Sequence, residues 1–273
     1  MTHRVALVTG ASSGIGEAAA RRLQELGLTV YAAARRTARM AHLAERGVRP
    51  LAMDVTDEQS RQQGIARIIA ECGRVDVLVN NAGYGCLGAV EDVPLDEARH
   101  QFEVNVFGAA RLIQLVLPHM RERHSGRIVN VSSIGGRIHT PLGAWYHATK
   151  YALEGLSDVL RLEVAPFGID VVVIQPGGIR TEFAALAAEH LREVSGDGVY
   201  GRRARAVAEA LSTGRGTRHL SSPVVVADAI GKAATAPRPR TRYAVGFGAR
   251  PLLALRRALP DRGFDAVVRR AVA

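Results

Sequence analysis

The sequence lacks the features of a membrane, secreted or metal-binding protein. It has no apolar run of about 18 residues, which a membrane-spanning helix requires. The chain passes directly into the apolar segment Val5–Val8 without the two regions of a secretory signal, so we expect a cytoplasmic protein. Only two cysteines are present, Cys72 and Cys86, too few for a disulfide framework or a zinc motif. We therefore expect no metal site.

Lysine is scarce and aromatic residues make up only 5% of the chain, although the net charge is +10. Lys150 and Lys232 are the only lysines, so almost all the basic residues are arginine. Nine arginines lie between residues 238 and 273, and aromatic side chains that could stack on bases are not interleaved with them. We therefore do not expect nucleic-acid binding. For the basic tail 249–273 we expect packing beside the substrate cleft or weak contact with an anionic surface.

Short apolar runs alternate with segments of helical periodicity, and 47% of the 273 residues are hydrophobic. Such alternation predicts βαβ units with right-handed connections, and therefore an α/β protein with a doubly wound parallel sheet, the Rossmann fold. The expected strands are 4–9, 28–34, 48–53, 75–80, 127–132, 169–175 and 243–247. The expected helices are 15–26, 37–46, 56–72, 95–123, 144–165 and one starting at 222–223. We expect one domain, 1–248, whose loop 182–222 binds substrate, followed by a tail of two short helices broken at Pro260.

A glycine-rich segment, Thr9–Gly16, follows the first predicted strand. Gly10 permits a sharp turn, Gly14 allows the backbone to approach a pyrophosphate, and Gly16 allows the next helix to pack closely. The N-terminus of that helix offers free N–H groups and a positive dipole end to phosphate. The segment therefore predicts a dinucleotide site.

The second predicted strand ends at Ala34 and is followed by Arg35 and Arg36. In dinucleotide folds an acid near this point binds the ribose hydroxyls of NAD, whereas arginine pairs with the 2′-phosphate of NADP. Arginine instead of an acid predicts NADP(H), with NAD(H) as the less favoured cofactor. The alternative is that both are ordinary exposed arginines.

Tyr146 and Lys150 are four residues apart at the start of a predicted helix, so they share one face. An ammonium beside a phenol favours the phenolate and lowers its pKa from about 10. Ser133 follows the fifth predicted strand, at the edge of the sheet where ligands bind in open α/β folds. Ser132 is the rival, but its side chain should point to the opposite face.

Together these segments resemble the short-chain dehydrogenase/reductase family. The family's motifs occur in order over residues 4–181 as Thr9–Gly16, Asp54, Asn80–Gly83, Asn105, Ser133, Tyr146–Lys150 and Pro176–Thr181. The resemblance implies that Tyr146 is the acid/base, that Ser133 hydrogen-bonds the substrate oxygen, and that Lys150 binds the nicotinamide ribose and lowers the pKa of Tyr146. It also implies that Asn105 holds a water linking Lys150 to solvent.

The resemblance implies that loops along one sheet edge hold the cofactor. Asp54 would meet the adenine, while Ile179 and Thr181 would meet the carboxamide. The expected cofactor-binding residues are Gly10, Ser12, Ser13, Gly14, Ile15, Gly16, Arg35, Asp54, Val55, Asn81, Ala82, Gly83, Tyr146, Lys150, Pro176, Gly177, Ile179 and Thr181. Ser13 departs from the many NADP-preferring relatives with a basic residue there, so the preference for NADP(H) rests mainly on Arg35.

Chain length and local sequence resemble most the 17β-hydroxysteroid and retinol dehydrogenase branch, which implies a lipophilic alcohol or carbonyl substrate. The expected lining residues are Ser133 and the apolar Leu87, Leu142, Trp145, Phe183 and Leu186, each of which could equally be core. A 3-oxoacyl thioester reductase is an alternative, and so is a non-catalytic NADP-binding regulator, although a regulator would be expected to have lost Tyr146 or Lys150. The family analogy suggests a homodimer or homotetramer.

Overall fold

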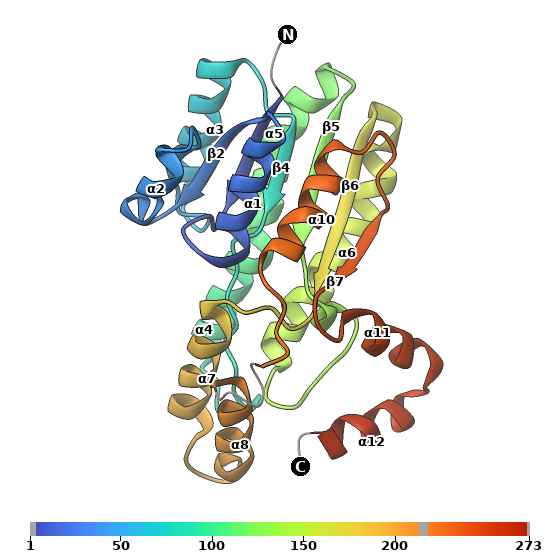
Figure 1. Cartoon of the computed structure of the whole chain (residues 1–273). Coiled ribbons are helices and arrows are strands. Elements are labelled where there is room, and N and C mark those ends of the chain that lie inside the picture. The colour runs from blue at the N-terminus through green and yellow to red at the C-terminus, as the bar shows by residue number, and fades with distance from the viewer. Residues whose placement is uncertain (1–3, 213–217, 272–273) are drawn as a thin grey trace.

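The computed structural model describes residues 4–212 and 218–271, and these form a seven-stranded parallel sheet flanked by helices (Figure 1). The strand order is β3-β2-β1-β4-β5-β6-β7. The order reverses between β1 and β4, which is the switch point where ligands bind in such sheets. The predicted fold class is confirmed.

The strands are short apolar runs, and the central ones are buried on both faces because helices cover the sheet from both sides. Their bounds are β1 Val5–Thr9, β2 Thr29–Ala34, β3 Arg49–Ala52, β4 Val77–Asn80, β5 Gly126–Val131, β6 Ile169–Pro176 and β7 Arg242–Val245. The helices are α1 Gly14–Glu25, α2 Ala41–Ala44, α3 Glu58–Cys72, α4 Leu95–Phe102, α5 Gly108–Glu122, α6 Ala144–Val164, α7 Glu182–Ser195, α8 Gly201–Ser212, α10 Val224–Thr235, α11 Ala249–Ala258 and α12 Asp261–Ala271.

Two apolar layers cover the two faces of the sheet. Helices α1 and α10 pack against each other on one face, where Leu23 and Ile230 are fully buried. Helices α3, α5 and α6 cover the other face with side chains such as Ile68 and Leu112. These layers fix the strand ends, and hence the loops that follow them, because close-packed interiors permit little movement.

Several local predictions need correction. The helix expected over 37–46 is a 3₁₀ turn, Thr37–Met40, followed by the short α2. The helix expected over 95–123 is interrupted by a π-helical segment, Glu103–Phe107, which separates α4 from α5. Helix α3 is capped by Asp57, whose side chain accepts from the Ser60 N–H at 2.6 Å, so it begins after the predicted start at residue 56.

The C-terminal part contains the two tail helices predicted on either side of Pro260. The buried side chains of Leu253 in α11 and Phe264 in α12 pack with Ile138, just beyond β5, so the tail packs on the domain. Helices α7 and α8 pack together below the sheet (Figure 1), and residues 213–217 of the predicted loop 182–222 lie outside the described residues. Among the described residues, no helix has both the length and the apolarity needed to cross a membrane.

Candidate active site

The Gly-rich loop between β1 and α1 forms a tight cradle. Gly10 and Gly14 have φ values of 65° and 59°, in the left-handed region that favours glycine. A Cβ at Gly10 would lie 2.8 Å from the Ala82 Cα, and one at Gly16 would lie 2.3 Å from the Gly10 carbonyl oxygen. No side chain of the described chain caps α1 at Ser13, so its first N–H groups remain available. The cradle fits a pyrophosphate group.

The segment after β4 holds this cradle in place. The Asn81 side-chain amide donates to the carbonyl oxygens of Thr9 at 2.9 Å and Gly10 at 3.3 Å. The Thr9 hydroxyl accepts from the N–H groups of Asn81 and Ala82, both at 3.0 Å. The Asn81 side chain, predicted to contact cofactor, is thus engaged in shaping the loop, whereas the Gly83 backbone is exposed toward the cleft.

The adenosine side of the site carries Arg35, Arg36 and Asp54. Both arginines are exposed at the end of β2. Asp54 accepts from the Thr56 N–H at 2.9 Å and from its hydroxyl at 2.8 Å, which is the geometry of a turn. Burial raises the pKa of Asp54, but the bonds from Thr56 and the positive charge of Arg35 outweigh it and leave that pKa below its usual value. Asp54 is therefore ionised beside Arg35. Its neighbour Val55, also predicted to contact cofactor, is half-buried and packs with the α3 and α5 core.

Ser133, Tyr146 and Lys150 meet at the carboxyl end of β5. Ser133 opens a 3₁₀ turn, Ile134–Gly136, and its Oγ accepts from the Gly135 N–H at 3.0 Å. Its hydroxyl proton is therefore free to be donated, and Ser133 lies close enough to Tyr146 to act against the rise of the Tyr146 pKa. The Lys150 Nζ lies 5.9 Å from the centre of the Tyr146 ring and donates to the Val131 carbonyl at 3.1 Å. The predicted trio is thus brought together.

Burial dominates the titration of Tyr146 and Lys150. Burial raises the pKa of Tyr146 above its ordinary value, and the bond from Ser133 offsets only part of that effect. Burial also lowers the pKa of Lys150 to about 8, against the opposing charge of Glu154. Lys150 is not among the causes of the Tyr146 shift, so the expected lowering of the pKa of Tyr146 by Lys150 stays a prediction.

Asn105 lies in the π-helical segment, a geometry frequent at functional sites. Its amide donates to the Tyr84 carbonyl and to the Thr149 hydroxyl, both at 3.0 Å, while its Oδ1 accepts from the Tyr84 N–H. The Asn105 side chain thereby ties the β4 loop to α6. A Cβ at Gly83 would lie 3.0 Å from the Asn105 Oδ1 and 3.6 Å from the Lys150 Nζ. A glycine at this position therefore leaves space beside both side chains.

The turn from β6 into α7 lies next to the glycine-rich loop. Pro176 ends β6, Gly177 donates to the Val245 carbonyl at 2.8 Å, and Ile179 packs its side chain into the core. Thr181 caps α7, and its methyl group would lie 3.2 Å from a Cβ at Gly14. This turn therefore lies directly over the phosphate cradle.

An ion pair that the sequence reasoning missed fastens this turn to the adenosine side. Glu182 accepts from Arg39 at 2.6 Å, and both side chains are exposed. The bond and charge of Arg39, with smaller contributions from Arg36 and Ser13, lower the pKa of Glu182. An anionic side chain thus occupies the basic rim of the cradle. The two residues are 143 positions apart, so no local pattern in the sequence indicates this pair.

The predicted apolar lining is only partly assembled around Tyr146. The Phe183 ring is 37% exposed and lies 5.4 Å from the Tyr146 ring, between centres. Leu87 and Leu142 instead pack with Ala89 and Leu191 in a separate apolar cluster. Trp145 packs near Cys86 and lines a hollow of about 340 Å³ on α4, with Leu95, Phe102 and Phe107 among its neighbours. Leu186 is exposed on α7.

Comparison with known proteins finds short-chain dehydrogenases and reductases. A family model described as short chain dehydrogenase matches residues 4–192. A 3-ketodihydrosphingosine reductase from Bacteroides thetaiotaomicron is 43% identical over 67% of this chain and 66% of its own length. A probable short-chain type dehydrogenase/reductase from Helicobacter pylori, VdlC, is 35% identical over 98% of this chain and 97% of its own.

Solved structures match nearly the whole fold. A short-chain dehydrogenase from Streptomyces avermitilis superposes with a TM-score of 0.83 at 36% identity and covers 94% of this chain and 93% of its own. An actinorhodin polyketide ketoreductase variant with NADPH gives a TM-score of 0.73 at 33% identity, over 86% of this chain and 91% of its own.

Proposed function

Because this chain belongs to the short-chain dehydrogenase/reductase family of oxidoreductases, we propose that it is an NADP(H)-dependent enzyme that interconverts a lipophilic alcohol and its ketone or aldehyde. The observation that carries the proposal is the meeting of Ser133, Tyr146 and Lys150 beside a glycine cradle. A non-catalytic regulator would have no need of this arrangement.

In this proposal the chain's own residues bind the cofactor and move a proton. The Gly10–Gly16 loop and the α1 N-terminus hold the pyrophosphate, Arg35 binds the 2′-phosphate, and Lys150 binds the nicotinamide ribose. When bound, NADPH supplies the hydride that reduces the substrate carbon. Ser133 donates a hydrogen bond to the carbonyl oxygen, and Tyr146 delivers its phenolic proton to that oxygen. In the reverse direction Tyr146 accepts the proton from the alcohol.

Because the pKa of Tyr146 is raised, its phenol is protonated at neutral pH, the form that gives up a proton in the reductive direction. Lys150, whose pKa is lowered to about 8, carries a proton over most of the neutral range and can replace the one that Tyr146 gives up. Phe183 would form an apolar wall against which a lipophilic substrate lies.

Two named relatives support a ketone substrate. One is the 3-ketodihydrosphingosine reductase, and the other is the polyketide ketoreductase. The second relative also favours the alternative proposal of a carrier-bound 3-oxoacyl thioester, whose acidic carrier protein would meet the +10 surface of this chain.

The test measures the oxidation of NADPH and of NADH by the protein in the presence of candidate carbonyl substrates. These are long-chain 3-keto bases, steroid and retinoid carbonyls, aromatic ketones and acetoacetyl thioesters. We expect turnover of an apolar free carbonyl with NADPH preferred by at least about tenfold, the worth of one charge-assisted contact. Turnover of thioesters alone would favour the alternative. NADPH binding without turnover of any carbonyl class would contradict the proposal.

A further inference from the structure

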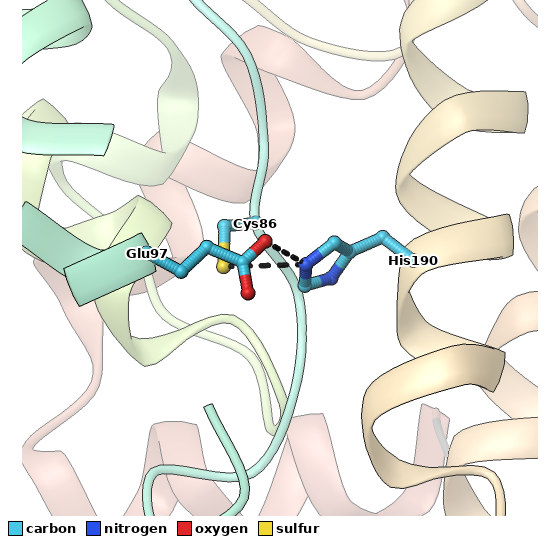
Figure 2. Close-up of side chains that lie close together, drawn as sticks. All are labelled: Cys86, Glu97 and His190. Carbon is cyan, nitrogen blue, oxygen red and sulfur yellow. Dashed lines mark hydrogen bonds and ion pairs between the residues drawn. The ribbon is translucent and has the colours of Figure 1, made fainter. Parts of the chain in front are cut away.

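Three side chains from separate segments meet outside the catalytic trio (Figure 2). Cys86 lies in the loop after β4, Glu97 in α4 and His190 in α7. The Cys86 Sγ is 3.7 Å from the His190 Nε2, and a Glu97 oxygen contacts that same nitrogen. Their ligand atoms all lie within 4.8 Å of one another. Cys86 is 1% exposed, and the side chains of His190 and Glu97 are 19% and 31% exposed.

The hydrogen bond of His190 to the backbone directs its other ring nitrogen toward Cys86 and Glu97. Its Nδ1 lies 2.8 Å from the Leu87 carbonyl oxygen, which can only accept, so Nδ1 carries a proton. With that proton on Nδ1, the Nε2 lone pair is directed toward Cys86 and Glu97, which is the arrangement of a metal-bound imidazole.

The set of donor atoms is one that a metal ion can bind. Imidazole nitrogen, thiolate sulfur and carboxylate oxygen together match the ligand preference of zinc. The Leu87 carbonyl fixes the tautomer that turns Nε2 inward, as carbonyls behind metal-bound histidines do. A carboxylate and a histidine alone would form an ordinary ion pair, but the pair would not require the buried thiol at 3.7 Å.

We propose that Cys86, Glu97 and His190 bind a Zn²⁺ ion, with water in the fourth position. As the zinc–sulfur bond forms, the Cys86 thiol proton leaves to solvent, and no electron is transferred.

The ion would fasten α7 to the floor of the substrate cleft. The residue next to Cys86 is Gly85, where a Cβ would lie 2.6 Å from the Phe183 ring. Phe183 in turn contacts Tyr146. Zinc would therefore hold Phe183 and the start of α7 against the catalytic side chains. This consequence for catalysis rests on the proposed function, whereas the binding of zinc does not depend on it.

The test uses the tag-free full-length protein after chelator treatment, titrated with Zn²⁺ alone and, for its absorption spectrum, with Co²⁺ alone. We expect one ion per chain and a thiolate-to-cobalt charge-transfer band. Cys86→Ala, His190→Gln and Glu97→Gln should each weaken zinc binding by about 100-fold or more, beyond what the loss of an outer partner costs. Cys72→Ala, which removes the chain's other thiol, should bind as the unmodified protein does.

Thermal unfolding gives a second readout that does not depend on activity. Zinc at 100 times its Kd should raise the Tm of the unmodified protein and of Cys72→Ala by about 5–10 °C, and leave the three ligand variants unmoved. Glu97→Gln changes a partly exposed side chain and keeps its shape, so it remains informative if Cys86→Ala folds poorly. Binding that is equally strong in the ligand variants, or absent in the unmodified protein, would overturn the site and leave a His190–Glu97 ion pair.

Discussion

Ser132 and Ser133 are adjacent but differ in what surrounds their hydroxyl groups. Ser133 Oγ is anchored by the Gly135 N–H and lies beside Tyr146, whereas Ser132 Oγ is buried without a hydrogen-bond partner among the described residues. Ser133→Ala should lower kcat by about 10²–10³-fold, the cost of losing one donor to a developing oxyanion. Ser132→Ala, the matched control, should keep kcat near the unmodified value. Steady-state kinetics measures kcat of both variants. Equal losses of kcat would contradict the assignment of Ser133 as the residue that contacts the substrate oxygen.

Arg35 tests the cofactor preference. It is exposed at the end of β2 beside the ionised Asp54, and a 2′-phosphate there would gain a charge-assisted contact. Arg35→Ala should weaken NADPH binding by about 10–100-fold and leave NADH binding unchanged. Arg46→Ala, an exposed arginine beyond α2, is the control. Fluorescence titration measures both cofactors, and an unchanged NADPH Kd would mean that Arg35 is merely solvated.

Lys150 gives a pH prediction for stability. The lowered pKa of about 8 means that the folded protein binds fewer protons than the unfolded chain between about pH 8 and 10.5. Burying the charged ammonium thus lowers the free energy of unfolding by its full amount below pH 8. This loss of stability disappears as the pH rises from about 8 to 10.5 and the folded protein's lysine becomes neutral. The free energy of unfolding of the cofactor-free protein, relative to Lys150→Met, should therefore rise by about 2–3 kcal/mol from pH 7 to pH 10. Urea unfolding measures it, and a constant difference would refute the lowered pKa.

At the scale of elements, sequence periodicity predicted the sheet well and its connections less well. Short apolar runs such as Val77–Val79 were correctly predicted as strands, because a strand covered by helices on both faces is apolar at every position. The interruption at Glu103–Phe107 could not be predicted, because its residues keep helical periodicity and the π-turn is set by contacts of Asn105 with Tyr84 and Thr149. Long-range partners of this kind leave no trace in local sequence.

The same limit applies to the site. Tyr146, Lys150 and the glycine loop carry local spacing that identifies them. The Arg39–Glu182 pair joins residues 143 positions apart, and the Cys86–His190 contact joins residues 104 apart, so only the fold brings them together. Leu87 and Leu142 were ambiguous in sequence because an apolar side chain near a site can equally belong to the core.

The start of α7 should compete with the cofactor at the rim of the cradle. Glu182 pairs with Arg39 and lies close to Arg36 and Ser13, where a phosphate would meet the same charges. Glu182→Gln should therefore strengthen NADPH binding by about two- to fivefold at low salt, the worth of an exposed pair. Glu189→Gln removes the same charge from an exposed position of α7 and should have no effect. Isothermal titration checks this, and equal or weaker binding by Glu182→Gln would rule the competition out.

At the scale of the whole molecule, the two C-terminal helices carry six arginines and two aspartates, a net +4 of the chain's +10. Phe264 anchors α12 beside Ile138, while Arg262, Arg269 and Arg270 are exposed. The protein should sediment with vesicles of anionic phospholipid, with a salt-sensitive affinity that falls about fivefold for each arginine changed to glutamine. NADPH binding should not change in these variants. Sedimentation that is absent, or indifferent to salt, would exclude surface contact by the tail.

The most direct test of the account is the turnover of Tyr146→Phe with NADPH and a responsive carbonyl substrate. The loss of one hydroxyl should lower kcat by about 10²–10⁴-fold and leave the NADPH Kd near the unmodified value, because the proton donor is lost while the cradle is intact. Tyr151→Phe, on the next turn of α6, should retain full activity. A Tyr146→Phe variant that turns over as fast as the unmodified protein would contradict the central claim that Ser133, Tyr146 and Lys150 form the active site.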